Sequence, residues 1–135
     1  MEQVGVAVMF LYNTEKKLLM QKRSADEKHY PGYWGCFGGH IEKGETPEQA
    51  LRREMLEELE YKVTKPTALS ITEFIERNKK ITTYNFIEIY DESQKLIQHE
   101  GDAYGWFTVE EALQLKITNQ RREVLYQAQE FLKSI

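Results

Sequence analysis

Three glutamates at close helical spacing are the residues of this chain best suited to chemistry. Glu54, Glu57 and Glu58 fall at positions i, i+3 and i+4, so on a helix their carboxylates project from one face. Like charges at this spacing repel one another in water, whereas a divalent cation bound between them would make the net interaction attractive. Carboxylate oxygens suit Mg²⁺ or Mn²⁺, with water and phosphate oxygens completing the octahedron. A solvated, glutamate-rich helix face is the alternative for so short a pattern.

Residues 46–59 predict the helix that positions these glutamates. Thr46 is a favourable N-cap, Pro47 suits the first helical position, and Gln49 completes a capping box. No glycine, proline or β-branched residue follows up to Leu59, and most positions hold strong helix formers. The glycine-containing segment that precedes this helix, beginning at Gly38, is predicted to be a loop.

The glutamates belong to a longer pattern. Gly39, five residues, Glu45, seven residues and then Arg53-Glu54-Met55-Leu56-Glu57-Glu58 resembles the Nudix box at nearly every defined position. The family has a glycine where this chain has Glu60, and usually a small aliphatic residue where it has Tyr61. That glycine ends the helix in a left-handed conformation, which costs other residues about 1 kcal/mol. The segments LLMQKRS, PGYWGCFGGH and GWFTVEEAL also resemble parts of many bacterial Nudix hydrolases.

The remaining pattern predicts a mixed α/β fold. Apolar and alternating segments predict strands at 4–12, 17–23, 33–37, 63–76, 80–90 and 103–107. Helices are predicted at 109–115, and from a cap at Thr118 or Asn119 to Lys133. These elements predict an α/β/α sandwich. The resemblance implies a mixed, partly parallel sheet in a single Nudix hydrolase domain over residues 1–135.

Composition excludes several classes of function. A chain of 135 residues fits one domain, and its formal charge of −4 argues against a nucleic-acid polymer as partner. Cys36 is the only cysteine, which is consistent with a reducing cytoplasm. The amino terminus lacks the pattern of a signal peptide, and no apolar run is long enough to span a membrane. A cytoplasmic protein that binds a small molecule is therefore expected; the oligomeric state, a homodimer included, stays open.

The resemblance implies a hydrolase that cleaves a nucleoside diphosphate linked to a further group X, using Mg²⁺ or Mn²⁺. Glu57 and Glu58 are the first choice as metal ligands, with Glu54 next and the backbone carbonyl of Gly38 a further candidate. Arg53 can orient a carboxylate without binding metal.

The general base is left among three residues. Glu45 and Glu57 belong to the box. Glu100 lies in the polar segment 91–102, where several relatives place an acidic residue near the metals. For Glu100, a solvated loop glutamate is an equally good interpretation.

Substrate contacts are expected at Arg23, Gly39 and Asn119. Arg23 could bind a phosphate group in a bidentate manner. Asn119 matches the place of nucleobase-contacting asparagines in relatives that hydrolyse oxidised purine triphosphates. Asn119 also starts a helix, however, and N-capping explains it without a ligand, so we favour the cap. Tyr33 and Trp34 are among the aromatic residues that could stack on a base.

The expected substrate is a nucleoside triphosphate, including an oxidised one such as 8-oxo-dGTP, or a nucleotide sugar. Two alternatives use a similar fold. One is an isopentenyl diphosphate isomerase, in which Cys36 would be the protonating residue. The other is a non-catalytic domain that senses a nucleotide, although such domains usually lose the box carboxylates that this chain keeps.

Overall fold

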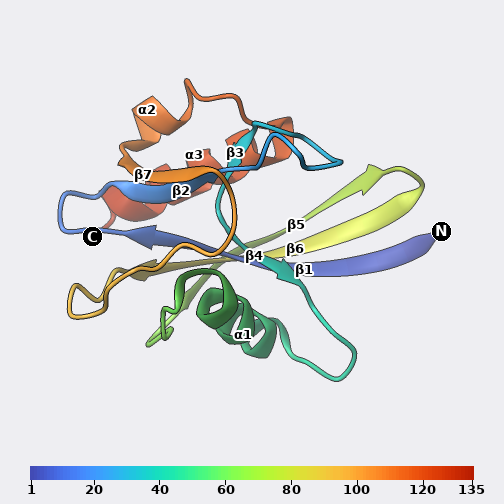
Figure 1. Ribbon diagram of the computed structural model, residues 1–135, viewed down its shortest axis with the longest axis horizontal. Helices are drawn as coiled ribbons and strands as arrows, with labels where there is room; N and C mark the ends of the chain where they lie inside the picture. Colours follow the sequence, from blue (N-terminus) through green and yellow to red (C-terminus); the bar gives the residue numbers. More distant parts are fainter.

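The computed structural model describes all residues, 1–135, as a mixed α/β fold (Figure 1). The elements in chain order are β1 (Glu2–Tyr12), β2 (Leu18–Lys22), β3 (Trp34–Gly35), β4 (Phe37–His40), α1 (Pro47–Leu59), β5 (Thr67–Glu76), β6 (Lys79–Ile89), β7 (Ala103–Phe107), α2 (Val109–Ala112) and α3 (Asn119–Lys133). No helix is both long enough and apolar enough to cross a membrane.

The sheet lies between two helical layers. β1 runs parallel to β6 along its whole length, from Glu2 opposite Lys79 to Tyr12 opposite Ile89, and β5 pairs with β6 in the antiparallel sense. Figure 1 shows α1 below the sheet, with α2 and α3 above it. The predicted α/β/α sandwich with a mixed sheet is confirmed.

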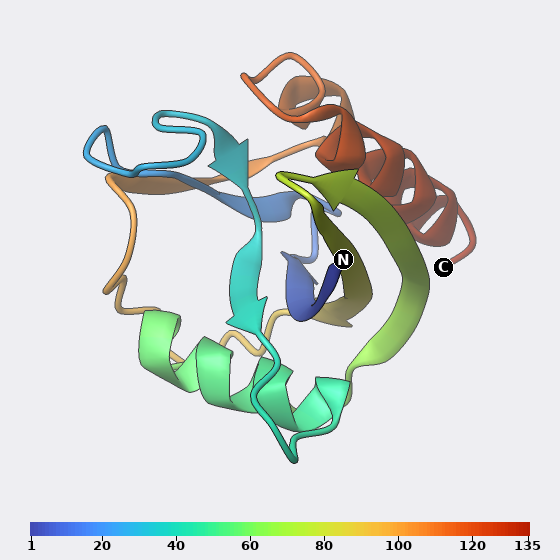
Figure 2. The same cartoon turned by 90° about the vertical axis from the view of Figure 1, so that its right-hand side faces the viewer.

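The sheet divides near its middle. β1 pairs with β2 only at Tyr12 and Leu18, and β2 then turns away to pair with β7 along its length. β4 takes the vacated place beside β1, so that Val6 lies opposite His40 and Met9 lies opposite Phe37. In Figure 2 the chain through β3 and β4 therefore descends from the upper layer toward α1. This crossing opens a space between the two parts of the sheet.

The predicted glycine loop is wrong. Gly38 and Gly39 lie within β4, paired with Val8 and Ala7 of β1. The predicted strand 33–37 instead contains all of β3 and the first residue of β4, with Cys36 between the two strands. The reason is steric, because a Cβ on Gly38 would lie 2.1 Å from the carbonyl oxygen of Ala7. These glycines allow two strands to approach closely. In a sequence, a glycine needed for close packing cannot be told from a glycine in a flexible loop.

Two other predicted boundaries were also wrong. The strand predicted from residue 63 begins at Thr67, because the backbone N–H groups of Thr64 and Lys65 donate to the buried carboxylate of Glu88 instead of to a neighbouring strand. The helix predicted to residue 115 ends at Ala112, after a capping box formed by Thr108 and Glu111 as expected.

The core has one apolar cluster on each face of the sheet. Beneath α1 lie Leu51, Met55 and Leu59 of the helix, with Met9 of β1 and Phe37 of β4. Beneath α3 lie Val124, Leu125 and Ala128, against apolar side chains of β1, β2 and β6. The two clusters fix α1 and α3 against opposite faces of the same central strands.

Candidate active site

The capping box at the start of α1 is formed as predicted. The Thr46 hydroxyl accepts a hydrogen bond from Gln49 N at 3.1 Å, and the Gln49 side chain accepts one from Thr46 N at 2.8 Å. The cap fixes where α1 begins, and so fixes the orientation of the glutamates that follow along it.

The helix ends at Glu60, which takes the left-handed conformation with φ 52° and ψ 34°. Its N–H donates to Leu56 O at 3.0 Å, and Tyr61 N donates to Met55 O at 3.2 Å. The Tyr61 ring is buried, while its hydroxyl donates to Glu88 and accepts from Asp91 N. Glu60 and Tyr61 depart from the Nudix box, but the helix still ends in the left-handed conformation that the family glycine adopts. The left-handed residue is here a strained glutamate, and a hydrogen-bonded tyrosine follows it.

Arg53 organises the carboxylates beside the amino-terminal half of α1. Its guanidinium donates to both oxygens of Glu45, at 2.8 and 3.0 Å, and to Glu54 at 2.8 Å. It also donates to the carbonyl oxygen of His40 at 3.0 Å, which ties the helix to the end of β4. The hydrogen bond from Arg53 lowers the pKa of Glu45 to about 2. Glu45 is thus ionised, and both of its carboxylate oxygens accept hydrogen bonds from Arg53.

Glu58 is the buried carboxyl group of the site. Its side chain lies against β4, where Oε1 accepts a hydrogen bond from Gly38 N at 3.1 Å. Burial, followed by the neighbouring carboxyls of Glu100 and Glu54, raises the pKa of Glu58 to about 10. The fold therefore brings Glu100, from a distant loop, next to two glutamates of α1.

Gly39 explains how Glu54 reaches the same place. A Cβ on Gly39 would lie 2.6 Å from the carboxyl carbon of Glu54, closer than real Cβ contacts allow. The carboxylate of Glu54 thus lies directly on the backbone of β4. Gly38 and Gly39 together let the strand approach both Glu54 and Glu58.

Glu57 has different surroundings from the other two box glutamates. Its side chain is 58% exposed and lies 3.5 Å from Arg53. As the side chains stand, no three or more His, Cys, Asp and Glu residues are grouped so that they could hold a metal ion. Glu54, Glu58 and Glu100 lie together as neighbouring carboxyls, and Glu57 lies at their solvent edge.

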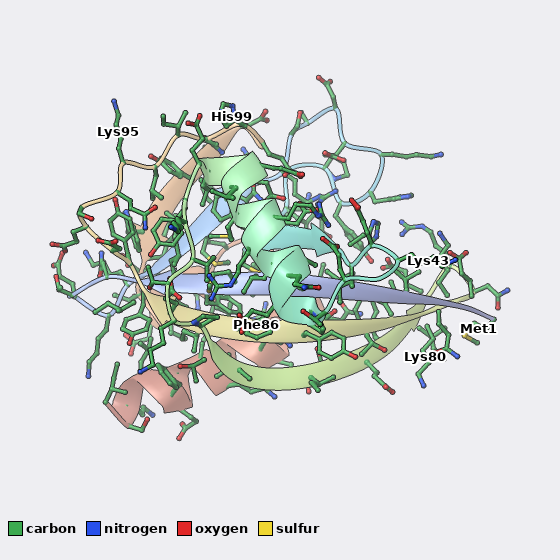
Figure 3. All side chains as sticks on the ribbon, turned by 90° about the horizontal axis from the view of Figure 1, so that it is seen from below. Met1, Lys43, Lys80, Phe86, Lys95 and His99 are labelled. Carbon is green, nitrogen blue, oxygen red and sulfur yellow. The ribbon has the colours of Figure 1, made fainter.

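The loop that carries Glu100 is attached to the carboxyl end of α1. His99 N donates to Glu58 O at 2.8 Å, and Ile97 N donates to Leu59 O at 3.0 Å, so the loop satisfies carbonyls that the helix leaves unpaired. The His99 ring also lies 2.5 Å from the Glu60 carboxylate. Figure 3 labels His99 beside this end of α1. Nothing in the sequence around His99 signals these contacts, because its partners are far away in the chain.

A cleft of about 250 Å³ lies between the sheet and the amino-terminal end of α3. Strands β1, β5 and β6 form one side, and residues of the 23–36 segment, with Tyr33 and Trp34 among them, form another. Cys36 also lines the cleft, and burial raises the pKa of its thiol. Two residues later, Gly38 contacts Glu58, so the β3–β4 crossing connects the cleft to the carboxylates.

Arg23 lines this cleft, as its predicted contact with substrate requires. Its guanidinium donates to the carbonyl oxygen of His29 at 3.1 Å and to the carboxylate of Glu27 at 3.2 Å. It therefore also orders the loop 24–33 that borders the cleft.

The interpretation of Asn119 as the N-cap of α3 is wrong. Thr118 is the cap, and its hydroxyl accepts a hydrogen bond from Arg121 N at 3.1 Å. Asn119 is the first residue of the helix, it is exposed, and it is not among the residues that line the cleft. Thr118, Gln120 and Arg121 do line the cleft. Both Thr and Asn are good caps, so the sequence left a one-residue ambiguity.

Known proteins share this fold and these motifs. The model of the NUDIX domain matches residues 1–128. The chain is 51% identical over 41 residues to the nucleoside triphosphatase NudI of Enterobacter sp. (strain 638), a match that covers 30% of this chain and 29% of that protein. It is 35% identical over 77 residues to the 8-oxo-dGTP diphosphatase of Proteus vulgaris, covering 56% of this chain and 66% of that protein.

Solved structures match over nearly the whole chain. The MutT protein of Methanosarcina mazei Go1 superposes with a TM-score of 0.85 at 18% identity, covering 98% of this chain and 96% of that one. The ORF135 protein of E. coli superposes with a TM-score of 0.84 at 25% identity, covering 99% and 94%. The domain match, together with the box residues gathered on β4 and α1, shows that this chain belongs to the NUDIX family.

Proposed function

We propose that this protein is a Nudix pyrophosphohydrolase that cleaves the diphosphate linkage of a nucleotide with the help of Mg²⁺ or Mn²⁺. The proposal is carried by the surroundings of Glu58. This buried carboxyl accepts a hydrogen bond from Gly38 N, and Glu54 and Glu100 lie beside it. A protein that stabilised only its own fold would gain nothing from crowding like charges there.

The donor set fits a divalent cation. Glu54 and Glu58 offer hard oxygen ligands where β4 has no side chain in the way. Glu57, which lies exposed beside Arg53, and the backbone carbonyl of Gly38 are proposed as further ligands. A bound Mg²⁺ or Mn²⁺ would neutralise the carboxylates and the phosphate oxygens of the substrate. Burial, and then the neighbouring carboxyls of Glu100 and Glu54, raise the pKa of Glu58, and such a cation would offset both effects.

The other residues of the site take supporting roles. Arg53 holds Glu54 and Glu45 in fixed positions through three hydrogen bonds of 2.8–3.0 Å. Among the candidate bases, Glu45 has both oxygens on Arg53, and its Oε1 also accepts from Glu42 N. Glu100 is exposed, and its carboxyl lies beside Glu58 at the proposed metal ligands, where the attacking water would be held. We therefore assign Glu100 as the general base.

The nucleoside is proposed to occupy the cleft, with its phosphates toward the carboxylates. Aromatic rings of Tyr33 and Trp34 line the cleft and offer stacking surface to a base. Arg23 lines it as well and can reach a phosphate group. The names of the relatives NudI and 8-oxo-dGTP diphosphatase support a nucleoside triphosphate over a nucleotide sugar as substrate.

A substrate panel tests the proposal. The purified protein should release nucleoside monophosphate and pyrophosphate from at least one nucleoside triphosphate, with Mg²⁺ or Mn²⁺ and not with EDTA. Metal should also raise the melting temperature by mass action, and Glu58→Gln should abolish that rise. No hydrolysis of triphosphates or nucleotide sugars, with no thermal response to metal, would refute the proposed function.

A further inference from the structure

Two buried side-chain oxygens in this molecule have no hydrogen-bond partner, Oε1 of Gln21 and Oδ1 of Asn85. Leaving a buried acceptor unpaired is costly, so each needs an explanation. Oε1 of Gln21 lies close to Gly101, since a Cβ there would be 2.6 Å away, and so faces the end of the loop 91–102. Gln21 and Asn85 both line the cleft, and Asn85, in the middle of β6, is only 1% exposed.

The orientation of the Asn85 amide is fixed by its surroundings. Nδ2 has four acceptors within 3.2–3.4 Å, on Ser70, Thr72 and Thr83. Two of these acceptors are the backbone carbonyls of Ser70 and Thr83, which cannot donate. Turning the amide over would place Oδ1 against these carbonyls. The unpaired group of Asn85 is therefore an acceptor and not a donor, and Asn85 is one of the residues that line the cleft.

A cationic donor lines the same cleft. Arg121, in the first turn of α3, is half-buried, and its guanidinium carbon lies 5.5 Å from the centre of the Phe10 ring. Its positive charge also acts on the Cys36 thiol, where it opposes the rise in the thiol pKa that burial causes. Guanidinium groups only donate, so Asn85 Oδ1 and Arg121 give the cleft an oriented acceptor and a set of donors that cannot exchange roles.

We propose that Asn85 and Arg121 select nucleobases that carry an exocyclic amino group next to a ring acceptor on the Watson–Crick edge, namely cytosine or adenine. This inference rests on the proposed function, in which the base occupies the cleft. The amino group would donate to Asn85 Oδ1, and the adjacent ring nitrogen would accept from Arg121. Uracil and hypoxanthine reverse this pattern, because a keto oxygen replaces the amino group and a ring N–H replaces the acceptor. The reversed pattern sets acceptor against acceptor and donor against donor.

Matched nucleotide pairs test the selection on the unmodified protein. CTP is compared with UTP, and ATP with ITP, by kcat/KM with Mg²⁺, and by calorimetric binding of their α,β-methylene analogues. In at least one pair the amino nucleotide should be preferred by about tenfold to a hundredfold, the usual effect of leaving a buried polar group unpaired. Equal values in both pairs, or a preference for the keto nucleotide, would overturn the inference.

The two proposals fail in different ways. If triphosphates are hydrolysed without preference between amino and keto bases, the selection is wrong and the proposed function stands. If the analogues bind with the amino preference, and neither triphosphates nor nucleotide sugars are hydrolysed and metal gives no thermal response, the proposed function is wrong and the selection stands.

Two variants then locate the preference in Asn85. Asn85→Leu removes the acceptor at similar volume and should bring the amino-to-keto ratio close to one. Thr72→Val is the control, because it removes one acceptor of the Asn85 Nδ2 group and leaves Oδ1 in place. It should keep the wild-type ratio. A folded Asn85→Leu protein with the wild-type ratio would refute the role of Asn85, and the wild-type measurements stand if that variant does not fold.

Discussion

The two faces of the sheet hold polar groups in opposite ways. On the face covered by α1, charged side chains contact one another. Arg53 donates hydrogen bonds to Glu45 and Glu54, and Glu58 lies beside other carboxyl groups. On the face covered by α3, the cleft holds a neutral amide, Asn85, fixed by ordinary hydrogen bonds, and an arginine. The first arrangement suits phosphate and metal chemistry on any nucleotide, and the second suits discrimination between bases.

This difference predicts separable effects of mutation. Changes on the α1 face should lower the rate on every substrate to a similar degree, because the phosphates are common to all nucleotides. Changes in the cleft should alter the ranking of substrates more than the best rate. Four predictions test this division, beginning with the largest effect.

Glu58→Gln should lower kcat by at least ~10²-fold, the typical loss when one electrostatic stabiliser of a transition state is removed. The loss should be similar for CTP, UTP, ATP and ITP, because Glu58 lies at the carboxylates and not in the cleft. Steady-state kinetics on the four nucleotides measure both statements. Glu110→Gln, an exposed glutamate of α2, is the control and should have wild-type kinetics. A loss confined to one base would break the proposed division between the faces.

Gly39→Ala should lower activity by about 10²-fold or less, because a displacement near 1 Å of a catalytic group has an effect of that order. The added Cβ would lie 2.6 Å from the Glu54 carboxyl group, which must move. The metal-induced rise in melting temperature should shrink as well. Gly35→Ala is the matched control for this thermal measurement, since no atom lies within 4 Å of its added Cβ. An unchanged metal response in Gly39→Ala would show that Glu54 is not a ligand.

These two faces also differ in how far the sequence alone describes them. One face of α1 carries Glu54, Glu57 and Glu58, and Thr46 caps the helix. These features depend on contacts within a few residues, which the spacing of residues and capping preferences encode directly. The sequence predicts Gly38 and Gly39 as site residues but places them in a loop, because the need for close strand packing arises only when β1 lies beside β4.

The cleft could not be predicted in the same way. Asn85 becomes an oriented acceptor only because β5 places Ser70 and Thr72 around its amide, and nothing near residue 85 in the sequence signals this. Docking of the Glu100 loop depends similarly on His99 meeting the end of α1, 40 residues earlier in the chain. Long-range pairing decides these positions, and a single sequence carries no record of it.

Thr118→Ala should reduce the free energy of unfolding by about 1 kcal/mol, because it removes the hydroxyl that caps α3. Asn119→Ala is the matched neighbour and should stay within roughly 0.5 kcal/mol, as exposed substitutions usually do. Urea unfolding of both variants measures the difference. Because Asn119 lies outside the cleft lining, its variant should also keep the wild-type ranking of nucleotides. An altered ranking in Asn119→Ala would extend the base-selecting region beyond the cleft and restore Asn119 as a substrate contact.

Glu60→Gly tests the smallest effect, at the joint between helix α1 and the Glu100 loop. Glycine relieves the left-handed strain at φ 52°, a gain of roughly 0.5–1 kcal/mol, but it also removes the contact between Glu60 and His99. Both side chains are 50% exposed, and pairs of this kind contribute about 0.2–1 kcal/mol. The two terms nearly cancel, so the net change in unfolding free energy should lie within roughly 0.5 kcal/mol of zero.

A double-mutant cycle separates the two terms. His99→Ala removes only the pair, so Glu60→Gly should stabilise the protein more in the His99→Ala background than in the wild type. The backbone bonds from His99 N to Glu58 O and from Ile97 N to Leu59 O remain in every variant, so the Glu100 loop should stay attached and kcat should change little. Equal stabilisation in both backgrounds would mean that the Glu60–His99 contact contributes nothing. The left-handed strain at Glu60 would then have no compensating side-chain contact, and only the backbone hydrogen bonds would hold the Glu100 loop at the carboxylates.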